Sequence, residues 1–251
     1  MSSSIWTLCA GDSELRALRL SPWRVVEAQH QVSTRKLVDS TEEQILLEEL
    51  IDRAKPPDIT GGRFHYLLFT PFRYPPLLHG SRFGGRHERG IWYGSVELRS
   101  AFAEVSYYRF IFLEGSHADL GTIATPLTAF TVGVRAIRGA DLTNPPFDAH
   151  RAAISSPATY NESQQLGDAM RAANVEVFCY WSARDIENGT NVGVFAPTAF
   201  GKAKPRILET WHCAASRDRV DLTKGDYFTR RSFTFPRSQF LVDGALPSPA
   251  V

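Results

Sequence analysis

The chain has 251 residues, 43% of them hydrophobic, which is enough to bury a sizeable core in one large domain or in one domain with an appendage. Its 28 Lys and Arg residues nearly balance its 27 Asp and Glu residues, which excludes the overall basic character of nucleic-acid and membrane-surface binders and makes any cationic function local. The three cysteines lack a CxxC spacing and the seven histidines follow no ligand pattern, so we expect neither a disulfide framework nor a metal site.

The N-terminal segment has neither the basic start nor the long apolar core of a secretion signal. No apolar run approaches the roughly 20 residues that span a bilayer. We therefore expect a cytoplasmic protein, with neither a membrane nor nucleic acid as a direct partner.

Residues 1–60 are predicted to form a helical extension. A short helix is predicted over Arg24–Gln31. A second helix is predicted to begin at the capping box Ser40–Glu43, in which a serine and a glutamate satisfy free backbone N–H groups of the first turn. Its apolar residues share one face, which we expect to pack on the main body, and two prolines end it: Leu46, Leu47, Leu50 and Ile51, then Pro56 and Pro57.

From residue 61 onwards, short strands and helices follow one another. Strands are predicted over Phe64–Thr70, Ile91–Tyr93, Leu127–Ile137, Val175–Trp181, Asn191–Ala196, Arg206–Cys213 and Tyr227–Phe235. Helices are predicted from Ser95, as N-cap, to about Phe112, and over Ser163–Asn174. Because strands and helices do not alternate regularly, the pattern favours an α+β fold with central twisted β-sheets flanked by helices. We expect residues 61–240 to form the main domain and residues 241–251 a flexible tail.

The loop Gly80–Gly84 carries the first candidate binding residue, Arg82. Small neighbours let a phosphate approach the backbone, and a guanidinium can grip two phosphate oxygens at once. The alternative is an arginine that pairs with a loop carboxylate. Arg73 is a second candidate, because prolines on both sides would stiffen its loop, and Arg86 is a weaker third.

Tyr93 and Glu104 follow at intervals of eleven residues. Tyr93 ends a predicted strand, where its ring could stack on a flat heterocycle, although a core aromatic would fit the same pattern. Glu104 lies in the apolar helical stretch Ala101–Val105, whose inner face seldom carries a carboxylate without a partner or a task. If it points outward, it is only the polar side of the helix.

Ser182 follows an apolar strand and so projects from a strand end. No His/Asp spacing and no GxSxG turn accompany it, which argues against a hydrolase nucleophile. Ser182 is therefore expected to orient a ligand or a neighbouring group by hydrogen bonding.

Five short blocks together resemble the RES domain family, named for its arginine, glutamate and serine. In chain order they are Gly80–Gly84 with Arg82, Ile91–Tyr93, Ala101–Glu104, Trp181–Arg184 with Ser182, and Asn191–Phe195. The resemblance spans roughly Phe64 to Lys224. The family often has Trp-Asn where this chain has Phe83-Gly84.

The resemblance implies a compact domain similar to the ADP-ribosyltransferase fold, acting as the toxin of a bacterial toxin–antitoxin pair. It implies NAD+ as the substrate, no metal, and an antitoxin with a helix-turn-helix domain as the partner that covers the active site. With it we assign Glu104 to the ribose, Arg82 with Arg73 to the pyrophosphate, and Tyr93 to the nicotinamide. Ser182 would orient the ribose or the carboxamide, and Asn191 would help to bind NAD+.

The acceptor stays open at this point. Water would make the protein an NAD+ glycohydrolase, inorganic phosphate would make it a phosphorylase, and a protein side chain would make it an ADP-ribosyltransferase. A different class is a noncatalytic nucleotide-binding module, in which Arg82 and Tyr93 hold a ligand and Glu104 is structural.

Overall fold

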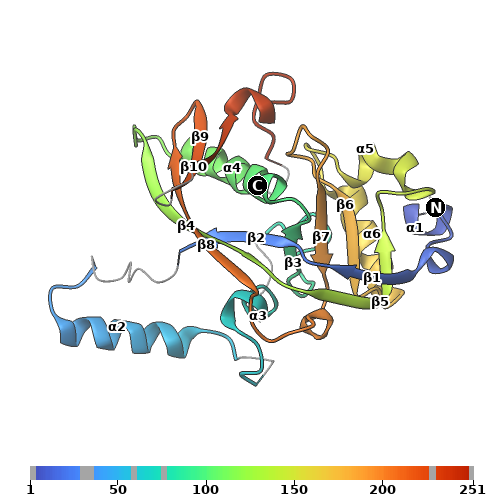
Figure 1. The fold of residues 1–251 in the computed structure, drawn as a ribbon, viewed down its shortest axis with the longest axis horizontal. Coiled ribbons are helices and arrows are strands. Elements are labelled where there is room, and N and C mark those ends of the chain that lie inside the picture. The colour runs from blue at the N-terminus through green and yellow to red at the C-terminus, as the bar shows by residue number, and fades with distance from the viewer. Residues whose placement is uncertain (1–3, 29–36, 58–60, 75–77, 226–229, 249–251) are drawn as a thin grey trace.

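The computed structural model describes residues 4–28, 37–57, 61–74, 78–225 and 230–248. Ten strands form one sheet in the order β1-β5-β6-β7-β3-β2-β4-β8-β9-β10, and Figure 1 shows its course. The strands are β1 (Arg16–Leu20), β2 (Trp23–Glu27), β3 (Trp92–Ser95), β4 (Ile123–Thr131), β5 (Val134–Asp141), β6 (Val177–Trp181), β7 (Thr190–Val194), β8 (Ile207–Ala215), β9 (Arg219–Gly225) and β10 (Arg230–Pro236). Neighbouring strands are antiparallel except β5 and β6, which are parallel.

Helices pack on both faces of this mixed, mostly antiparallel sheet. The α-helices are α1 (Ile5–Leu8), α2 (Thr41–Ala54), α3 (Tyr66–Arg73), α4 (Leu98–Glu114), α5 (Arg151–Ile154) and α6 (Asn161–Ala172). Short 3-10 helices are η1 (Gly11–Glu14), η3 (Phe147–His150), η4 (Pro197–Ala199) and η5 (Arg237–Phe240). None of the helices in the described ranges is long and apolar enough to cross a membrane.

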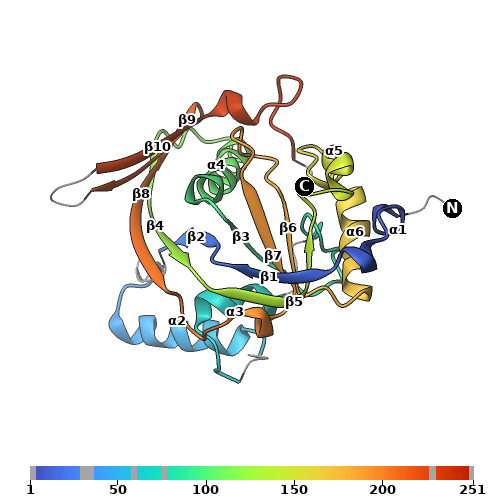
Figure 2. The same ribbon diagram turned by 45° about the vertical axis from the view of Figure 1, so that its right-hand side comes forward.

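The sheet curves around α4. Figure 2 shows α4 inside this curve, with β8 to β10 on one side and β3 and β7 on the other. Phe102, Ala103 and Phe110 of α4 are buried in the same apolar cluster as Trp211 of β8 and Phe235 of β10. The apolar face of α4 therefore fixes the helix against the sheet and leaves its other face for the site described below.

Strand β6 is buried on both faces and separates two further apolar clusters. Val177 and Cys179 face the cluster that includes α3, whereas Phe178 and Tyr180 face the cluster that includes α6. This alternation follows the two-residue period of a strand. It explains why the segment is continuously apolar in sequence.

The prediction of a helical N-terminal extension is wrong for the first part of the chain. Arg24, expected in a helix, lies in β2, and β1 is a further strand that was not predicted. Val25 and Val26 pack on opposite faces of the sheet, which suits β-branched residues in a strand. Residues 29–31 of the predicted helix lie outside the described residues. The N-terminal segment is thus part of the sheet rather than an appendage.

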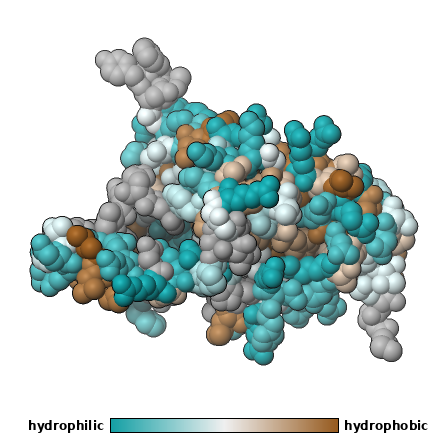
Figure 3. Space-filling model, turned by 90° about the horizontal axis from the view of Figure 1, so that it is seen from below, coloured by the Kyte–Doolittle hydropathy of each residue, from teal (hydrophilic) through white to brown (hydrophobic). Residues whose placement is uncertain are grey.

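The predicted helix at the capping box is confirmed as α2. Ser40 Oγ accepts the N–H of Glu43 at 3.1 Å, and the Glu43 carboxylate accepts the N–H of Ser40 at 3.3 Å. The expectation that its apolar face packs on the main body is wrong for Leu46 and Leu50, which are more than half exposed. Figure 3 shows this apolar surface in brown at the left.

Two elements differ from their predicted type or length. Phe64–Thr70, predicted as a strand, contributes to helix α3, because Leu68 and Phe72 lie one turn apart on its buried face and the His65 side chain caps its first turn. The single strand predicted over residues 127–137 is divided between β4 and β5, and β9 was not predicted.

The remaining predicted strands and helices are confirmed within a few residues, except that residues 227–229 of the last strand lie outside the described residues. The predicted N-cap of α4 is wrong, since Ser95 belongs to β3 and Glu97 precedes the helix.

The expected flexible tail folds back onto the core as far as it is described. Leu246 is buried in the cluster around α4, and the hydroxyl of Tyr107 donates a hydrogen bond to the carbonyl of Pro247. Residues 249–251 lie outside the described residues.

Candidate active site

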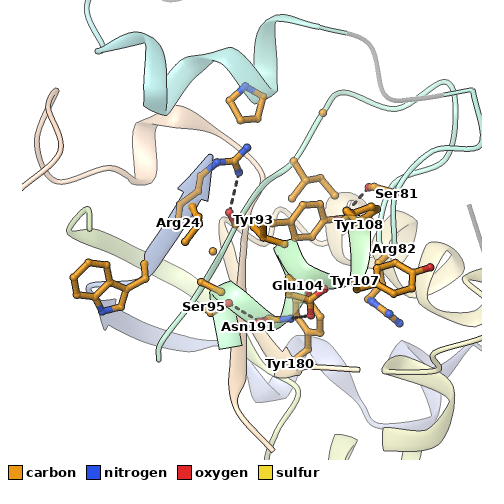
Figure 4. Close-up of a pocket in the computed structure, with 18 of the residues that line it drawn as sticks. Arg24, Ser81, Arg82, Tyr93, Ser95, Glu104, Tyr107, Tyr108, Tyr180 and Asn191 are labelled. Atoms are coloured by element: carbon orange, nitrogen blue, oxygen red, sulfur yellow. Dashed lines mark hydrogen bonds between the residues drawn. The ribbon is translucent and has the colours of Figure 1, made fainter. Parts of the chain in front are cut away.

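A cavity of about 680 Å³ opens between α4 and the strands at the centre of the sheet. Arg82, Tyr93 and Glu104 all line it, as Figure 4 shows. These three residues come from a loop, a strand and a helix, so only the fold brings them together. The arginine, tyrosine and glutamate that the sequence analysis assigned to one NAD+ molecule therefore lie around one cavity.

The loop that carries Arg82 is a tight turn closed by two hydrogen bonds between Ser81 and Gly84, at 2.7 and 3.3 Å. Phe83 anchors the turn, since its fully buried ring packs edge-on against Phe178. At Gly80 the backbone has φ +76°, and a Cβ atom would lie 2.3 Å from the carbonyl of Gly84, so only glycine fits. The loop is held rigidly from both ends.

Arg82 is only 7% exposed, so its charge lies almost entirely inside the protein. Its Nη1 donates to the carbonyl of Ser156 at 2.7 Å, and its guanidinium lies 4.7 Å from the ring centre of Tyr160. Within the described ranges, none of the ion pairs includes Arg82. The alternative of an arginine paired with a loop carboxylate is therefore wrong for the described residues, and the cation stays available to an anionic ligand.

Tyr93 is fixed by its hydroxyl group. The hydroxyl lies 2.9 Å from Ser81 Oγ and accepts the N–H of Phe83 at 3.2 Å. Burial raises the pKa of Tyr93 to about 12, against the opposing effects of these hydrogen bonds and of Arg82. The residue is thus a neutral, immobile wall of the cavity, which suits stacking rather than proton transfer.

Glu104 is placed by α4, whose first turn is tied to the loop after β6. Ser100 Oγ donates to Asp185 at 2.7 Å, and Arg99 forms an ion pair with the same carboxylate. A Cβ atom at Gly189 would lie 1.7 Å from Ser100 Oγ, so the close approach of this loop to α4 requires glycine. The helix therefore cannot slide relative to the loop that carries Ser182.

Ser182 contacts Glu104 directly. Its Oγ donates to Glu104 Oε1 at 2.8 Å and accepts the N–H groups of Arg184 and Asp185, each at 3.1 Å. Because a serine hydroxyl has one hydrogen, those two acceptor bonds leave the hydrogen for Glu104. Ser182 is buried and does not line the cavity that Glu104 faces.

Asn191 also holds Glu104. Its Nδ2 donates to Oε1 at 2.6 Å, and its Oδ1 accepts a hydrogen bond from Ser95 Oγ at 2.7 Å. Figure 4 shows both hydrogen bonds, one between Ser95 and Asn191 and one between Asn191 and Glu104. From the described part of the chain, no hydrogen bond reaches the other oxygen, Oε2. One carboxylate oxygen is thus fastened to the protein and the second is left free.

Arg73 does not join the site. It ends helix α3 rather than lying in a stiff loop, and its Nε donates to the carbonyl of Pro56. Arg73 is absent from the cavity wall, although its neighbours Pro71 and Tyr74 line it. Arg86, the weaker candidate, bonds His87 at 2.9 Å and is not part of the wall either.

Arg24 is a site residue that sequence reasoning missed. It reaches the cavity from β2 and donates through Nη1 to the carbonyl of Tyr93 at 2.8 Å. Burial lowers its pKa to about 10, so it is protonated at neutral pH. Its Nε has no hydrogen-bond partner, and none of the carboxylates described pairs with it. Arg24 is therefore a second unneutralised cation in the cavity wall.

Five further tyrosines of the wall were also missed as site residues. Tyr107 and Tyr108 lie three and four positions after Glu104 on α4, and Tyr74, Tyr160 and Tyr180 complete the set. The spacing from Glu104 places the first pair on the same helix face, a signal that the sequence contains. Together with Tyr93 they give the cavity flat, apolar walls between its two cations.

These residues can hold a ligand that combines negative charge with flat rings. The two arginines provide cationic donors, the tyrosines provide ring faces, and the free oxygen of Glu104 can stabilise a developing positive charge. Among the residues described, no group of three or more His, Cys, Asp or Glu side chains could hold a metal ion.

The sequence model of the RES domain matches residues 55–216, nearly two thirds of the chain. The chain belongs to the RES domain family. No curated protein matches the chain. Membership of the RES family indicates an NAD-related function associated with toxin–antitoxin systems.

Within the RES match lie Arg82, Tyr93, Glu104 and Ser182, whereas Arg24 comes from the segment before it. The cavity is therefore built partly from residues outside the region that defines the family.

Proposed function

We propose that this chain is a RES-family toxin that cleaves the bond between nicotinamide and ribose in NAD+. The observation that carries the proposal is Glu104, whose free Oε2 shares one cavity with two unneutralised arginines and several tyrosine rings. Cleavage would deplete NAD+ in the bacterial cytoplasm and arrest growth. An antitoxin with a helix-turn-helix domain would neutralise the toxin.

The chemistry needs an anion beside the ribose. When the glycosidic C–N bond breaks, its electron pair leaves with the nicotinamide, which becomes neutral, and positive charge develops on the sugar. A fixed carboxylate stabilises this charge in the transition state more than in the ground state. In this role Glu104 would contribute on the order of 3 kcal/mol, as one preorganised electrostatic contact does.

The rest of the cavity suits the rest of the dinucleotide. Arg82 and Arg24 are proposed to hold the pyrophosphate, because Arg82 is a buried and Arg24 a partly buried cation, and neither pairs with an acid among the described residues. Tyr93 is proposed to stack on the nicotinamide. Ser182 acts through Glu104 in this proposal, since its hydroxyl hydrogen is already used there.

Measurement of free nicotinamide tests the proposal. Purified wild-type protein incubated with NAD+ is expected to release it, and the Glu104→Ala variant is expected not to. Glu162→Ala, which removes an exposed carboxylate of α6, is the matched control and should keep full activity. NAD+ binding without release by the wild type would instead support a noncatalytic module.

The mass of the second product identifies the acceptor. Free ADP-ribose indicates water, a phosphorylated ADP-ribose formed only with added phosphate indicates a phosphorylase, and a mass increase on a lysate protein indicates an ADP-ribosyltransferase. In cells, expression of the wild type should arrest growth and lower NAD+, while the Glu104→Ala form is tolerated. Equal toxicity of both forms would contradict the catalytic explanation.

A further inference from the structure

The carboxylate of Glu104 is held asymmetrically, and the residues that hold it form a chain. Ser182 and Asn191 both donate to Oε1, at 2.8 and 2.6 Å. Behind Asn191, Ser95 donates to the amide oxygen at 2.7 Å. The chain runs from β3 through β7 to α4, which are separate parts of the sequence.

Ser95 and Asn191 are neighbours across the antiparallel pair β3 and β7, where their Cα atoms are partners in register. Both side chains are only 2% exposed. Each is therefore enclosed by protein almost completely, and both ends of the Asn191 amide are already used. Asn191 and Ser95 also line the cavity, so the role in NAD+ binding that we predicted for Asn191 from sequence stays a prediction.

The carboxylate of Glu104 selects the nitrogen end of the Asn191 amide, and the hydroxyl of Ser95 satisfies the oxygen end. The oxygen and nitrogen ends of an asparagine have nearly the same shape, so packing alone does not distinguish them. With Ser95 donating to Oδ1, Nδ2 is left to donate to the carboxylate. The reversed amide would place Oδ1 against the carboxylate oxygen, which is repulsive.

We infer that Ser95 and Asn191 are positioning residues that act through Glu104, fastening Oε1 so that Oε2 is presented to the ribose. This inference rests on the proposed function and deepens it. Neither residue needs to touch the substrate. A carboxylate that is free to rotate would lose part of its preorganisation, which affects the transition state more than the binding of the ground state.

The experiment compares three variants by the rate of nicotinamide release from NAD+. Ser95→Ala is expected to lower kcat about tenfold while KM for NAD+ changes less than about twofold, since only a transition-state interaction is weakened. Ser106→Ala is the matched control. Ser106 is a fully buried serine of α4 whose hydroxyl has no hydrogen-bond partner, so both constants should stay at the wild-type values.

The pH dependence of kcat in the Asn191→Asp variant tests the inference further, because a merely structural role of Asn191 would not change it. It places a second carboxylate beside Glu104, and two carboxylates that share a site cannot both ionise easily. The acid limb of the kcat–pH profile is therefore expected to move upward by about one pH unit or more.

The other charged or titratable groups that share the cavity with Glu104 are unchanged in this variant. They are Arg24, Tyr74, Arg82, Tyr93, Tyr107, Tyr108, Tyr160 and Tyr180. Of these, Tyr107, Tyr108 and Tyr180 interact electrostatically with Glu104.

The outcomes separate the inference from the function on which it rests. An inactive wild type overturns both. An active wild type with an unaffected Ser95→Ala variant overturns the inference alone. Circular dichroism and thermal unfolding show whether the Asn191→Asp protein is folded. If it is misfolded, the kcat values of Ser95→Ala and Ser106→Ala decide whether the inference holds.

Discussion

Ser182 donates its only hydroxyl hydrogen to Glu104, a residue that lies 78 positions earlier in the chain. The direction of this bond is fixed, because the same oxygen accepts the N–H groups of Arg184 and Asp185. Ser182 and Glu104 therefore form one hydrogen-bonded unit in this protein. The serine has no hydrogen left for a substrate.

The first prediction concerns this unit. Ser182→Ala should lower kcat about tenfold, and Glu104→Gln should lower it 10²-fold or more, because it removes the charge that faces the ribose. If Ser182 acts only through Glu104, adding Ser182→Ala to the Glu104→Gln variant should cause little further loss. Steady-state nicotinamide release by the four proteins checks this. Multiplicative losses in the double variant would show that Ser182 has a separate role.

Arg82→Lys tests the grip on phosphate. The substitution keeps the charge but removes the planar fork that contacts two oxygens, so KM for NAD+ should rise about tenfold. Arg86→Lys, which changes an arginine outside the cavity wall in the same segment, should leave KM unchanged. Identical kinetics of the Arg82→Lys variant and the wild type would rule out this arginine as a phosphate ligand.

The Arg24→Met variant tests whether Arg24 contributes to NAD+ binding rather than to the stability of the fold. Burial lowers the pKa of Arg24 to about 10, which means that the folded protein disfavours the charge that it carries at neutral pH. The neutral variant should therefore unfold with a free energy within about 1 kcal/mol of the wild type, the loss of one hydrogen bond being offset by relief of the buried charge.

The same variant should bind NAD+ at least about tenfold more weakly, since a charge-assisted contact to phosphate is lost. Calorimetric titration of NAD+ into the inactive Glu104→Gln background measures this directly. Unchanged affinity would mean that Arg24 does not face the ligand.

Asp141 gives a prediction for pH dependence. Burial raises its pKa, but hydrogen bonds from Thr143 and the charge of Arg16 outweigh this, so the net pKa lies below the ordinary value of 3.8. A lowered carboxyl pKa stabilises the fold above the unfolded-state value, and this contribution is lost as the pH falls through the folded-state pKa.

Asp141→Asn should therefore reduce the unfolding free energy by about 1 kcal/mol at neutral pH, with a smaller difference in acid. Urea denaturation at several pH values checks this. The exposed Asp218→Asn change should show no such trend. A difference that grows on acidification would contradict the assignment.

The α+β fold class and three residues of the cavity wall could be predicted from the sequence, whereas several individual elements could not, for physical reasons that particular residues show. Arg82, Tyr93 and Glu104 stand in short blocks whose residue types already indicate their chemistry, and the structure brings all three to one cavity. Arg24 was missed because the segment after Ser21 and Pro22 was interpreted as a short helix. Only pairing with β3 and β4 selects the strand.

Local sequence patterns also gave wrong predictions where tertiary contacts determine the type of an element or the burial of its apolar face. Phe64–Thr70 is apolar enough for a buried strand, yet packing on one face makes it a helix. Leu46 and Leu50 form an apolar face that fits a core, although the structure leaves them exposed. Amphipathic spacing predicts that a helix forms, but it does not identify the surface that the helix meets.

Strand β2 lies between β3 and β4, and this position has a consequence for protein engineering. A fragment limited to residues 55–216 would lack β2, leaving two unpaired strand edges in the middle of the sheet, and it would also lack β9 and β10. Such edges promote aggregation. Residues 55–216, which define the family, are thus not expected to remain monodisperse when expressed alone. Any truncated form would have to retain β2, β9 and β10.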